Sequence, residues 1–313
     1  MEEQRFGPVR FIPGENRGRY PYSHSVYVEG AGVLIDPASS HERLSRLRDH
    51  EGVNAVWLSH WHEDHFTYLD LFHDVPLLIS SADAPPISEI EVLLDWYGID
   101  NEDERHYWTC VLKDHFHFKP RKPSGFLREE IIDLGTVTVS VIATPGHTPG
   151  HLAFFFQEPG VVFMGDYDLT SFGPWYGDRD SSIEETIASI KRLKNIPAKV
   201  WLTGHDTGVF ENPEDFIWNR YEGVIYERER KLLDALKTPR TMAEITGLWI
   251  MYGKPREPKA FFEFGERVLV ECHDIVNAFL CHDIVNTHLF FNAICNQIPR
   301  PAFCPGRVSV FAL

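Results

Sequence analysis

The 313-residue sequence lacks the features that mark membrane-spanning, secreted and disulfide-bonded proteins. It contains no run of about 18 apolar residues, the length that a membrane-spanning helix needs. The N-terminus reads Met1-Glu2-Glu3 with no apolar stretch after it, so we expect no secretory signal. Its five cysteines are an odd number without a C-x-x-C pair, which favours reduced thiols over a disulfide framework. Together these absences predict a cytoplasmic protein without a membrane partner.

Basic residues are also scarce, with 30 Lys and Arg against 46 Asp and Glu and a formal net charge of −16. Binding to a phosphate backbone requires clustered Lys and Arg, so we expect no nucleic-acid partner. The negative charge is instead expected to support solubility. Apolar residues make up 43% of the chain, which is ordinary for a globular protein of one α/β domain with a smaller appendage.

Short apolar runs alternate with turn signals through the first two thirds of the chain. The predicted strands lie within residues 24–36, 54–59, 75–80, 131–143, 152–157, 161–164 and 200–203. Capping patterns that begin at Ser39 and Ser181 predict helices to about His50 and Leu193. Strands that pair by hairpins and alternate with a few helices favour a mixed α/β sandwich over a doubly wound sheet.

The chain is expected to have two parts. Residues 1–212 form the predicted catalytic domain, and residues 82–128 within it are an insert, helical over Ile87–Tyr97 and irregular elsewhere. A connection of this length inside a compact domain is typical of a lid or binding loop. Residues 213–313 form a predicted helical region, with one long amphipathic helix over Asp215–Leu236 and another capped at Thr241.

The C-terminal part carries many Phe and Leu side chains that must be buried. We expect them to pack on their own domain, with a homodimer contact or a lid over the site as the alternatives. The hexapeptide at 272–277 recurs at 281–286. A spacing of nine residues is about two and a half helical turns, so the copies fall on opposite helix faces. That geometry favours helix packing over one shared metal site.

The densest chemical pattern is His60-Trp61-His62-Glu63-Asp64-His65, with four candidate metal ligands in six residues directly after an apolar strand. Histidines at i and i+2 can converge on one ion, while Asp64 and His65 point toward a second. Imidazoles with a carboxylate suit zinc best, with iron or manganese as the alternatives. A polar loop rich in histidine is the competing interpretation, and four ligand types at this spacing disfavour it.

Three further candidates, His147, Asp166 and His205, each follow a predicted strand and a glycine. Glycine permits a close backbone turn, and loops at one rim of a rigid sandwich are where active sites gather. No Ser-His-Asp grouping accompanies them, so no protein nucleophile is expected.

In this order, the motifs resemble the metallo-β-lactamase-fold hydrolase superfamily over about residues 22–210. The resemblance implies an α/β fold, an αββα sandwich with a small helical C-terminal extension. It implies that one metal is bound by His60, His62 and His147, that the other is bound by Asp64, His65 and His205, and that Asp166 bridges the two. Asp166 and His62 point to the glyoxalase II, lactonase and RNase Z type, because β-lactamases carry Cys near the bridging position and flavo-diiron relatives carry Glu in place of His62.

The function that these motifs predict is metal-dependent hydrolysis of a small acyl molecule, a thioester, lactone or related ester. Two zinc ions would activate a shared hydroxide, and Asp64 can accept the proton of the water. Two alternatives remain open. One is a phosphodiesterase or nuclease with the same metals. The other is a persulfide-oxidising enzyme with a single iron at His60, His147 and Asp166.

Residues around the predicted ligands are assigned more loosely. Asp36 either orients a ligand histidine or is a turn residue before Pro37. Tyr167 and Tyr176 either support the ligands and the substrate or belong to the core. Lactonases carry Tyr three residues after the bridging Asp, whereas this chain has Leu169. Further candidates are a structural or supporting His151, surface histidines His106, His115 and His117, and a cationic site at Lys254, Arg256 and Lys259.

Overall fold

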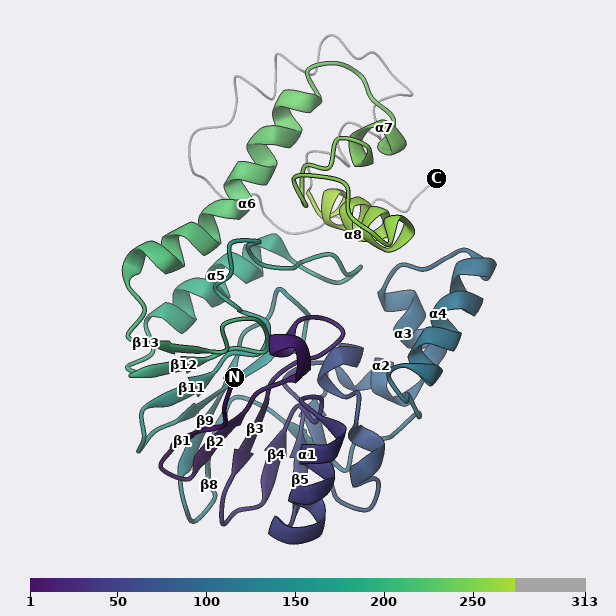
Figure 1. Ribbon diagram of the computed structural model, residues 1–313. Coiled ribbons are helices and arrows are strands. Elements are labelled where there is room, and N and C mark those ends of the chain that lie inside the picture. The colour runs from purple at the N-terminus through teal and green to yellow at the C-terminus, as the bar shows by residue number, and fades with distance from the viewer. Residues whose placement is uncertain (274–313) are drawn as a thin grey trace. The chain divides into compact units, whose positions relative to one another are not determined.

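Two β-sheets form the centre of the structure, a computed structural model that describes residues 1–273 (Figure 1). In the first sheet the strands follow chain order: β1 (Gln4–Phe6), β2 (Val9–Ile12), β3 (Ser25–Val28), β4 (Val33–Ile35), β5 (Ala55–Trp57), β6 (Leu77–Ser80) and β7 (Gly125–Leu127). Strands β1 to β4 pair antiparallel, and β4 to β7 pair parallel. The predicted hairpin that ends at Asp36 is therefore β3–β4.

The second sheet has the order β13 (Val209–Glu211), β12 (Val200–Leu202), β11 (Val161–Phe163), β10 (Leu152–Phe156), β9 (Thr138–Ala143) and β8 (Glu130–Asp133). All of its pairs are antiparallel except β11–β12. The parallel pair brings the ends of β11 and β12 to one edge of the sheet, so the loops that follow these two strands lie next to each other.

Alternation along the strands explains why the two sheets stack. In β3, Val26 and Val28 pack into a cluster with Phe154 and Phe163 of the second sheet. Tyr27, between them, faces the opposite way into a cluster with residues of the helices and the insert. Because side chains alternate in a strand, one face meets the other sheet and one face meets helices. The predicted α/β sandwich of helices outside two sheets is confirmed.

The first helices start close to where the sequence places them. Helix α1 (His41–Arg46) continues as a π-helical turn over Leu47–Glu51, and Ser40 precedes it without a side-chain capping bond. Helix α5 (Ile183–Lys194) begins one residue later than predicted, with the Ser182 side chain accepting from the Glu185 N–H. The chain also forms short 3₁₀ segments over Glu15–Gly18, Glu63–His65 and Leu69–Phe72.

The insert at residues 82–128 is more regular than expected. It contains α2 (Ala84–Ser88), α3 (Ile90–Trp96) and α4 (Glu102–Asp114). The expectation of an irregular segment after Tyr97 was wrong, because Asn101 caps α4 by accepting from the N–H groups of Asp103 and Glu104. Only Leu112 of α4 is buried, so the helix carries no broad apolar stripe in its sequence.

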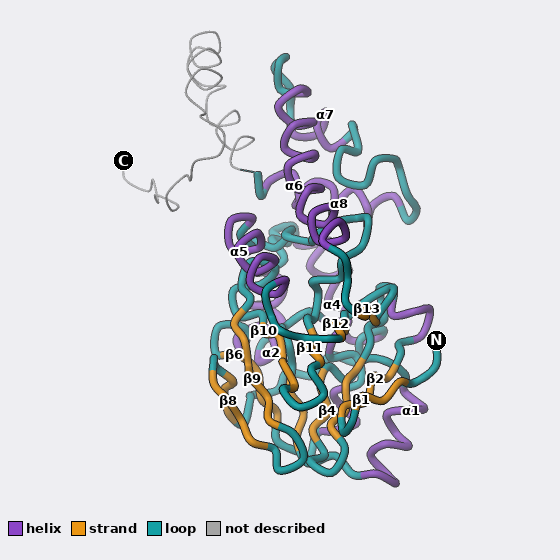
Figure 2. Tube along the Cα trace, turned by 90° about the vertical axis from the view of Figure 1, so that its left-hand side faces the viewer, coloured by secondary structure: helices purple, strands orange, loops and turns teal. Residues whose placement is uncertain are grey.

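The C-terminal part is helical as predicted, with α6 (Asp215–Ala235), α7 (Met242–Thr246) and α8 (Lys259–Glu271). Thr241 and Glu244 form the expected capping box of α7. These helices gather beyond one end of the strands (Figures 1 and 2). Residues Met1–His273 belong to one compact unit, and the boundary near residue 212 stays a prediction.

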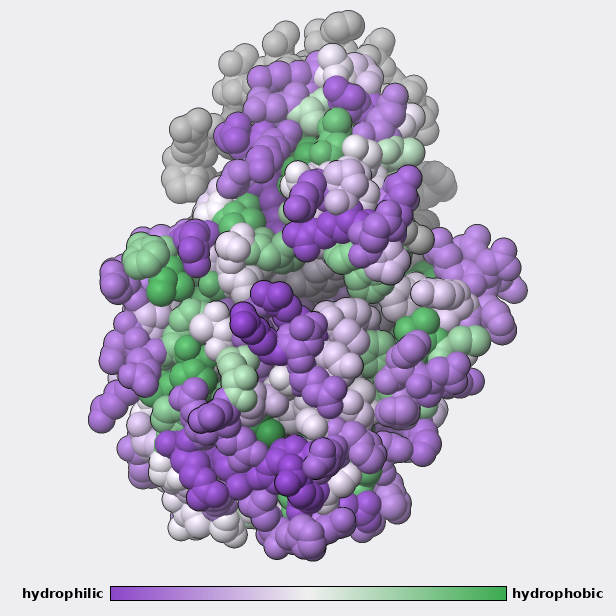
Figure 3. All heavy atoms as spheres, viewed as in Figure 1, coloured by the Kyte–Doolittle hydropathy of each residue, from purple (hydrophilic) through white to green (hydrophobic). Residues whose placement is uncertain are grey.

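Hydrophilic side chains cover much of the face drawn in Figure 3, with smaller hydrophobic areas between them. None of the helices in residues 1–273 is both long enough and apolar enough to cross a membrane. The repeat beyond His273 and most of the Phe-rich tail lie outside the described residues, so the interpretation of the repeat and the homodimer contact stay predictions.

Candidate metal centre

The loop after β5 turns sharply into the site because Asp36, at the end of the neighbouring strand β4, holds it. The backbone N–H of Ser59 donates to Asp36 Oδ1 at 2.8 Å, and the Ser59 hydroxyl donates to Oδ2 at 2.6 Å. Asp36 and Ser59 are fully buried. The chain then enters the 3₁₀ turn Glu63–His65, which carries Asp64 and His65.

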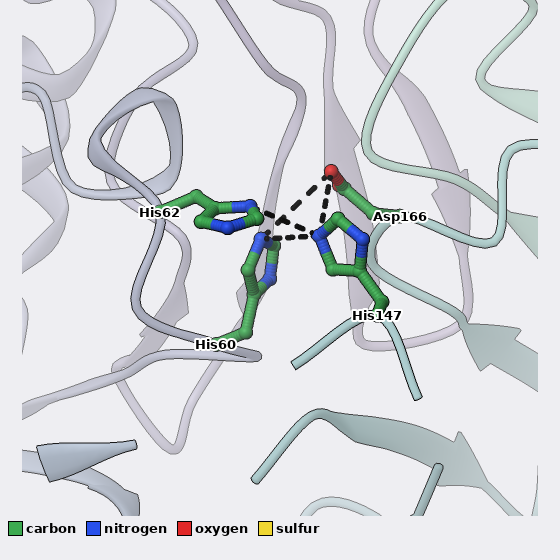
Figure 4. Close-up of side chains that lie close together, drawn as sticks. All are labelled: His60, His62, His147 and Asp166. Atoms are coloured by element: carbon green, nitrogen blue, oxygen red, sulfur yellow. Dashed lines mark hydrogen bonds and ion pairs between the residues drawn. The ribbon is translucent and has the colours of Figure 1, made fainter. Parts of the chain in front are cut away.

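Four residues form the first group of candidate ligand atoms, His60, His62, His147 and Asp166 (Figure 4). His147 Nε2 lies 3.2 Å from His60 Nε2, 3.0 Å from His62 Nδ1 and 3.3 Å from Asp166 Oδ2. Ligand atoms about 2.1 Å from a tetrahedral ion lie about 3.4 Å from one another. The spacing of these atoms therefore fits a single metal ion.

The second group comprises Asp64, His65 and His205. His65 Nε2 lies 3.2 Å from His205 Nε2, and His205 Nε2 lies 3.4 Å from Asp64 Oδ2. Asp166 Oδ1 belongs to this side as well, at 2.7 Å from His65 Nε2 and 3.3 Å from His205 Nε2. Asp166 thus faces the first group with one carboxylate oxygen and the second group with the other.

Hydrogen bonds on the far side of each imidazole determine which nitrogen faces the centre. His147 Nδ1 lies 3.1 Å from the Trp175 carbonyl, and His205 Nδ1 lies 3.0 Å from the Tyr22 carbonyl. A carbonyl oxygen only accepts, so both histidines carry hydrogen on Nδ1 and present the Nε2 lone pair to the centre.

For the other three histidines, a side-chain acceptor determines which ring nitrogen carries the hydrogen. His65 Nδ1 donates to Asp36 Oδ2 at 2.9 Å, and His62 Nε2 donates to Asp178 Oδ2 at 2.7 Å. The Ser59 hydroxyl gives its proton to Asp36, so it accepts from His60 Nδ1 at 2.9 Å. Each imidazole therefore aims one lone pair inward, which is the arrangement that a metal ligand needs.

The charges of the site also fit a cation. Burial alone would raise the pKa of Asp166, but the neighbouring His65 and His205 hold it well below its usual value. With hydrogen on Nδ1, His65 aims its Nε2 lone pair at Asp166 Oδ1 from 2.7 Å. Two acceptors at that distance repel each other unless a proton or a metal ion lies between them. A metal ion between these atoms would satisfy both acceptors, so the donor set fits a metal.

Gly165 and Gly204, which precede the candidate ligands Asp166 and His205, have no space for a side chain. Gly165 has a φ of +53°, and a Cβ there would lie 2.5 Å from His151 Nε2. At Gly204 a Cβ would lie 2.8 Å from Asp166 Oδ1. Neither position has room for a side chain, so both glycines let their strands end directly against the site.

Sequence reasoning missed Asp178 and Asp168. Asp178 is 2% exposed and bonds to His62, yet the run Asp178-Arg179-Asp180 reads as a solvated charged segment. Asp168 Oδ1 accepts the backbone N–H of His205 at 2.9 Å and forms a third possible metal group with Asp166 and His205. Burial raises its pKa to about 7. Its position two residues after Asp166 was the signal that could have identified it.

The other histidines named from the sequence lie either beside the site or on the surface. His151 Nε2 accepts the Asp166 N–H at 3.3 Å, so it supports the backbone beside the site. His106, His115 and His117 are exposed, as expected.

Tyr167 and Tyr176 are not among the residues that line the cavity, and substrate contact by either stays a prediction. Tyr167 donates to the carbonyls of Thr144 and Pro145, and the Tyr176 hydroxyl accepts from Arg228. Both side chains are fully buried and support neighbouring backbone segments.

A cavity of about 520 Å³ opens directly over the two groups. Its wall includes His62, Asp64, His147, Asp166 and His205, together with Glu63 between them in the chain. Glu63 is buried and accepts hydrogen bonds from the hydroxyls of Tyr20 and Tyr97, two further wall residues. Of the three cationic candidates only Arg256 lines the cavity, and Lys259 pairs with Glu263 at 3.2 Å.

Comparison with protein families and curated proteins places this geometry in a known context. The model of the metallo-beta-lactamase superfamily matches residues 19–205. A hydroxyacylglutathione hydrolase of Hyphomonas neptunium is 36% identical over 189 residues, which cover 58% of this chain and 60% of that protein. An atrochrysone carboxyl ACP thioesterase of Aspergillus fumigatus is 23% identical over 253 residues, covering 76% of this chain and 69% of the other.

A solved structure agrees with the fold. The chain resembles the crystal structure of a metallo-β-lactamase family protein from Thermus thermophilus with a TM-score of 0.63 and 20% identity. The match covers 87% of this chain and 93% of that one. It therefore extends past the sandwich into the helical C-terminal part.

Proposed function

The chain belongs to the metallo-β-lactamase superfamily and is a hydrolase of that superfamily, and from this we propose that it hydrolyses thioesters, lactones or related esters of small acyl compounds with two metal ions. The observation that carries the proposal is the placement of Asp166, whose two oxygens face two separate groups of ligand atoms. Relatives named as thioesterases and as a hydroxyacylglutathione hydrolase support acyl transfer to water as the reaction class.

The residues of the chain fit two ions. His60, His62 and His147 would hold one, Asp64, His65 and His205 would hold the other, and Asp166 would contact both. We propose zinc, with iron or manganese as the alternatives, because imidazoles with carboxylates suit a borderline cation and a related Bacillus subtilis protein is named a zinc-dependent hydrolase. Such a pair of ions, when bound, supplies a water of lowered pKa and stabilises negative charge on the acyl oxygen.

The chain's own residues supply orientation and proton transfer. Asp36 and Asp178 fix the rings of His65 and His62, so these ligands need no rearrangement during a reaction. Asp64 lies in the cavity wall, where its carboxylate can accept the proton that the attacking water loses. Aromatic side chains in the cavity wall provide apolar surface beside the candidate ligands, against which an acyl group can pack.

The test is a double variant, His62→Ala with Asp64→Ala, which removes one ligand from each group. We expect kcat/KM on a panel of N-acetylcysteamine thioesters and acyl-homoserine lactones to fall by more than about 100-fold, beyond the range seen when only a residue behind a ligand is lost. His115→Ala, an exposed histidine of the insert, is the matched control and should retain full activity.

Metal content completes the experiment. Elemental analysis of the wild-type protein should give two zinc ions per chain and about none in the double variant. Hydrolysis that survives the double substitution would refute the metal-dependent mechanism. One iron per chain would refute the dinuclear form. The same proteins are also assayed on bis(p-nitrophenyl) phosphate, a phosphodiester. If the wild type hydrolyses it faster than the thioesters and lactones, the acyl assignment is wrong.

A further inference from the structure

We infer that the cavity binds a bulky aromatic acyl group, and that Gly265 of α8 determines how large a group it accepts. This inference rests on the proposed acyl hydrolysis and adds the substrate class. Two observations support it: the aromatic composition of the cavity wall and a glycine inside helix α8. Metal binding by itself would require neither feature.

Besides the candidate ligands, aromatic side chains of separate chain segments line the cavity. They come from α4, from the loop after β11, from the segment between α7 and α8, and from α8: Trp108, Phe172, Trp175, Tyr252, Phe261 and Phe264. All of these side chains are half-buried, so each leaves part of its surface to the cavity. A volume of about 520 Å³ lies in the range that holds a drug-sized ligand, and an acetyl group would leave most of it unfilled.

Ring contacts hold this wall in a defined shape. The Trp108 ring centroid lies 5.9 Å from that of Phe261 and 6.1 Å from that of Phe264, which joins the insert to α8. Tyr20 of the N-terminal loop contacts Phe261 at 5.4 Å. Aromatic pairs at 4.5–7 Å gain energy from their geometry beyond the area that they bury. A flat aromatic substrate can extend this set of contacts, whereas a small acyl group cannot.

Gly265 lies in the middle of α8 (Lys259–Glu271), where glycine costs about 1 kcal/mol relative to alanine. A Cβ at this position would lie 2.5 Å from the Tyr252 hydroxyl and 3.3 Å from Cη2 of Trp175. Both of these residues line the cavity. The missing side chain therefore lets Tyr252 and Trp175 lie against the helix instead of projecting into the space for the substrate.

Gly223 provides a matched comparison. It lies inside α6 (Asp215–Ala235), and no heavy atom comes within 4 Å of a Cβ built there. Alanine at either position should raise helix stability. Only alanine at Gly265 should displace cavity residues, and the atom it meets most closely is the end of the Tyr252 side chain, which can move without unfolding the protein.

The experiment compares the zinc-loaded wild-type protein with Gly265→Ala and Gly223→Ala on two N-acetylcysteamine thioesters, acetyl and 2-naphthoyl. We expect the wild type to prefer 2-naphthoyl. Gly265→Ala should lower kcat/KM for 2-naphthoyl at least about 10-fold, the lower end of what one added methylene does in an apolar pocket. Its kcat/KM for acetyl should change less than about twofold, and Gly223→Ala should match the wild type on both.

A binding measurement separates this inference from the proposed function. The affinity for 2-naphthoate, followed by calorimetry, should fall in Gly265→Ala and stay unchanged in Gly223→Ala. If the wild type hydrolyses neither thioester while binding shows this pattern, acyl hydrolysis is refuted and the aromatic pocket stands. If the wild type prefers acetyl, or if Gly265→Ala changes neither selectivity nor binding, the inference is wrong.

Discussion

Five histidines of the candidate metal centre share one property, a fixed acceptor behind the ring. For His147 and His205 the acceptor is a backbone carbonyl, and for His62 and His65 it is a carboxylate. A carboxylate partner makes the imidazole more basic and so strengthens its bond to a metal. The carboxylates Asp36 and Asp178 are thus expected to affect metal affinity more than their distance from the centre suggests.

Asp178→Asn tests this expectation at a single residue. The variant keeps the shape of the side chain and removes the charge that faces His62 Nε2, so zinc affinity should fall about 10-fold, the lower end of the range for such partners. The measurement is competition for zinc against a chromophoric chelator. Asp180→Asn, two residues away and exposed, should bind zinc like the wild type. Equal affinities in all three proteins would show that Asp178 is merely structural.

The candidate ligands could be recognised in the sequence because each follows a strand end, and strand ends can be predicted from apolar runs. Asp178 could not be recognised in this way, since it lies 15 residues after Phe163, the last residue of β11. Its position depends on the path of the intervening loop, and that path depends on contacts with a helix far along the chain. A local pattern contains no information about such contacts.

The element that determines this path is α6. Its Arg228 is 2% exposed and donates to the carbonyls of Phe172 and Pro174 at 2.8 and 3.0 Å and to the Tyr176 hydroxyl at 3.2 Å. The loop that carries Trp175 and Asp178 is therefore held from the C-terminal part of the chain. Although α6 follows the predicted boundary at residue 212, it supports the same site.

The end of α8 joins this network through His273, which gives a pH prediction. The Tyr176 hydroxyl accepts from Arg228, which leaves its proton free to be donated to an unprotonated His273 Nε2 at 3.2 Å. Burial, with a further contribution from Arg228, lowers the pKa of His273 from 6.5 to about 4. Between these values the unfolded chain binds the proton more readily than the folded chain. Stability is therefore complete above pH 6.5 and falls as the pH drops toward 4.

His273→Gln should remove this part of the acid sensitivity. We expect its unfolding free energy, measured in urea, to fall less steeply than that of the wild type between pH 6.5 and about pH 4. His106→Gln, at an exposed histidine, serves as the control and should follow the wild type. Parallel curves for the wild type and His273→Gln would contradict the assignment, since other titrating groups are common to both proteins.

Elements with a strong apolar period were the predictable ones. The strands β4 and β5 end at Ile35 and Trp57, one and two residues before the predicted ends, and helix α6 covers Asp215–Ala235 as its pattern predicts. Helix α4 was missed because it buries only Leu112. At α5 the cap shifted by one residue, because the Ser181 hydroxyl donates to the His147 carbonyl and leaves Ser182 to cap the helix.

At the scale of the whole molecule, the candidate ligands join the two sheets. The loop after β5 belongs to the first sheet, whereas His147, Asp166 and His205 follow β9, β11 and β12 of the second. An ion bound by both sets would stabilise the folded protein by about 4 kcal/mol at a free concentration about 1,000 times its Kd.

Metal removal should therefore lower the melting temperature. After dialysis against a chelator we expect a lower Tm, and titration with zinc should raise it in a concentration-dependent way until both groups are filled. Asp166→Asn should reduce this zinc-dependent rise, because Asp166 faces both groups. A Tm that does not depend on zinc would mean that bound ions contribute nothing measurable to the stability of the folded protein.

The same division of ligands between sheets determines when a metal can be loaded during synthesis. A ribosome makes the His60–His65 run first, and at that moment neither group is complete. The first group needs Asp166 and the second needs His205, which is made 140 residues after His65. A nascent chain therefore displays a histidine-rich loop long before its partners exist. Metal loading can therefore be completed only after His205 has been made and both sheets are assembled.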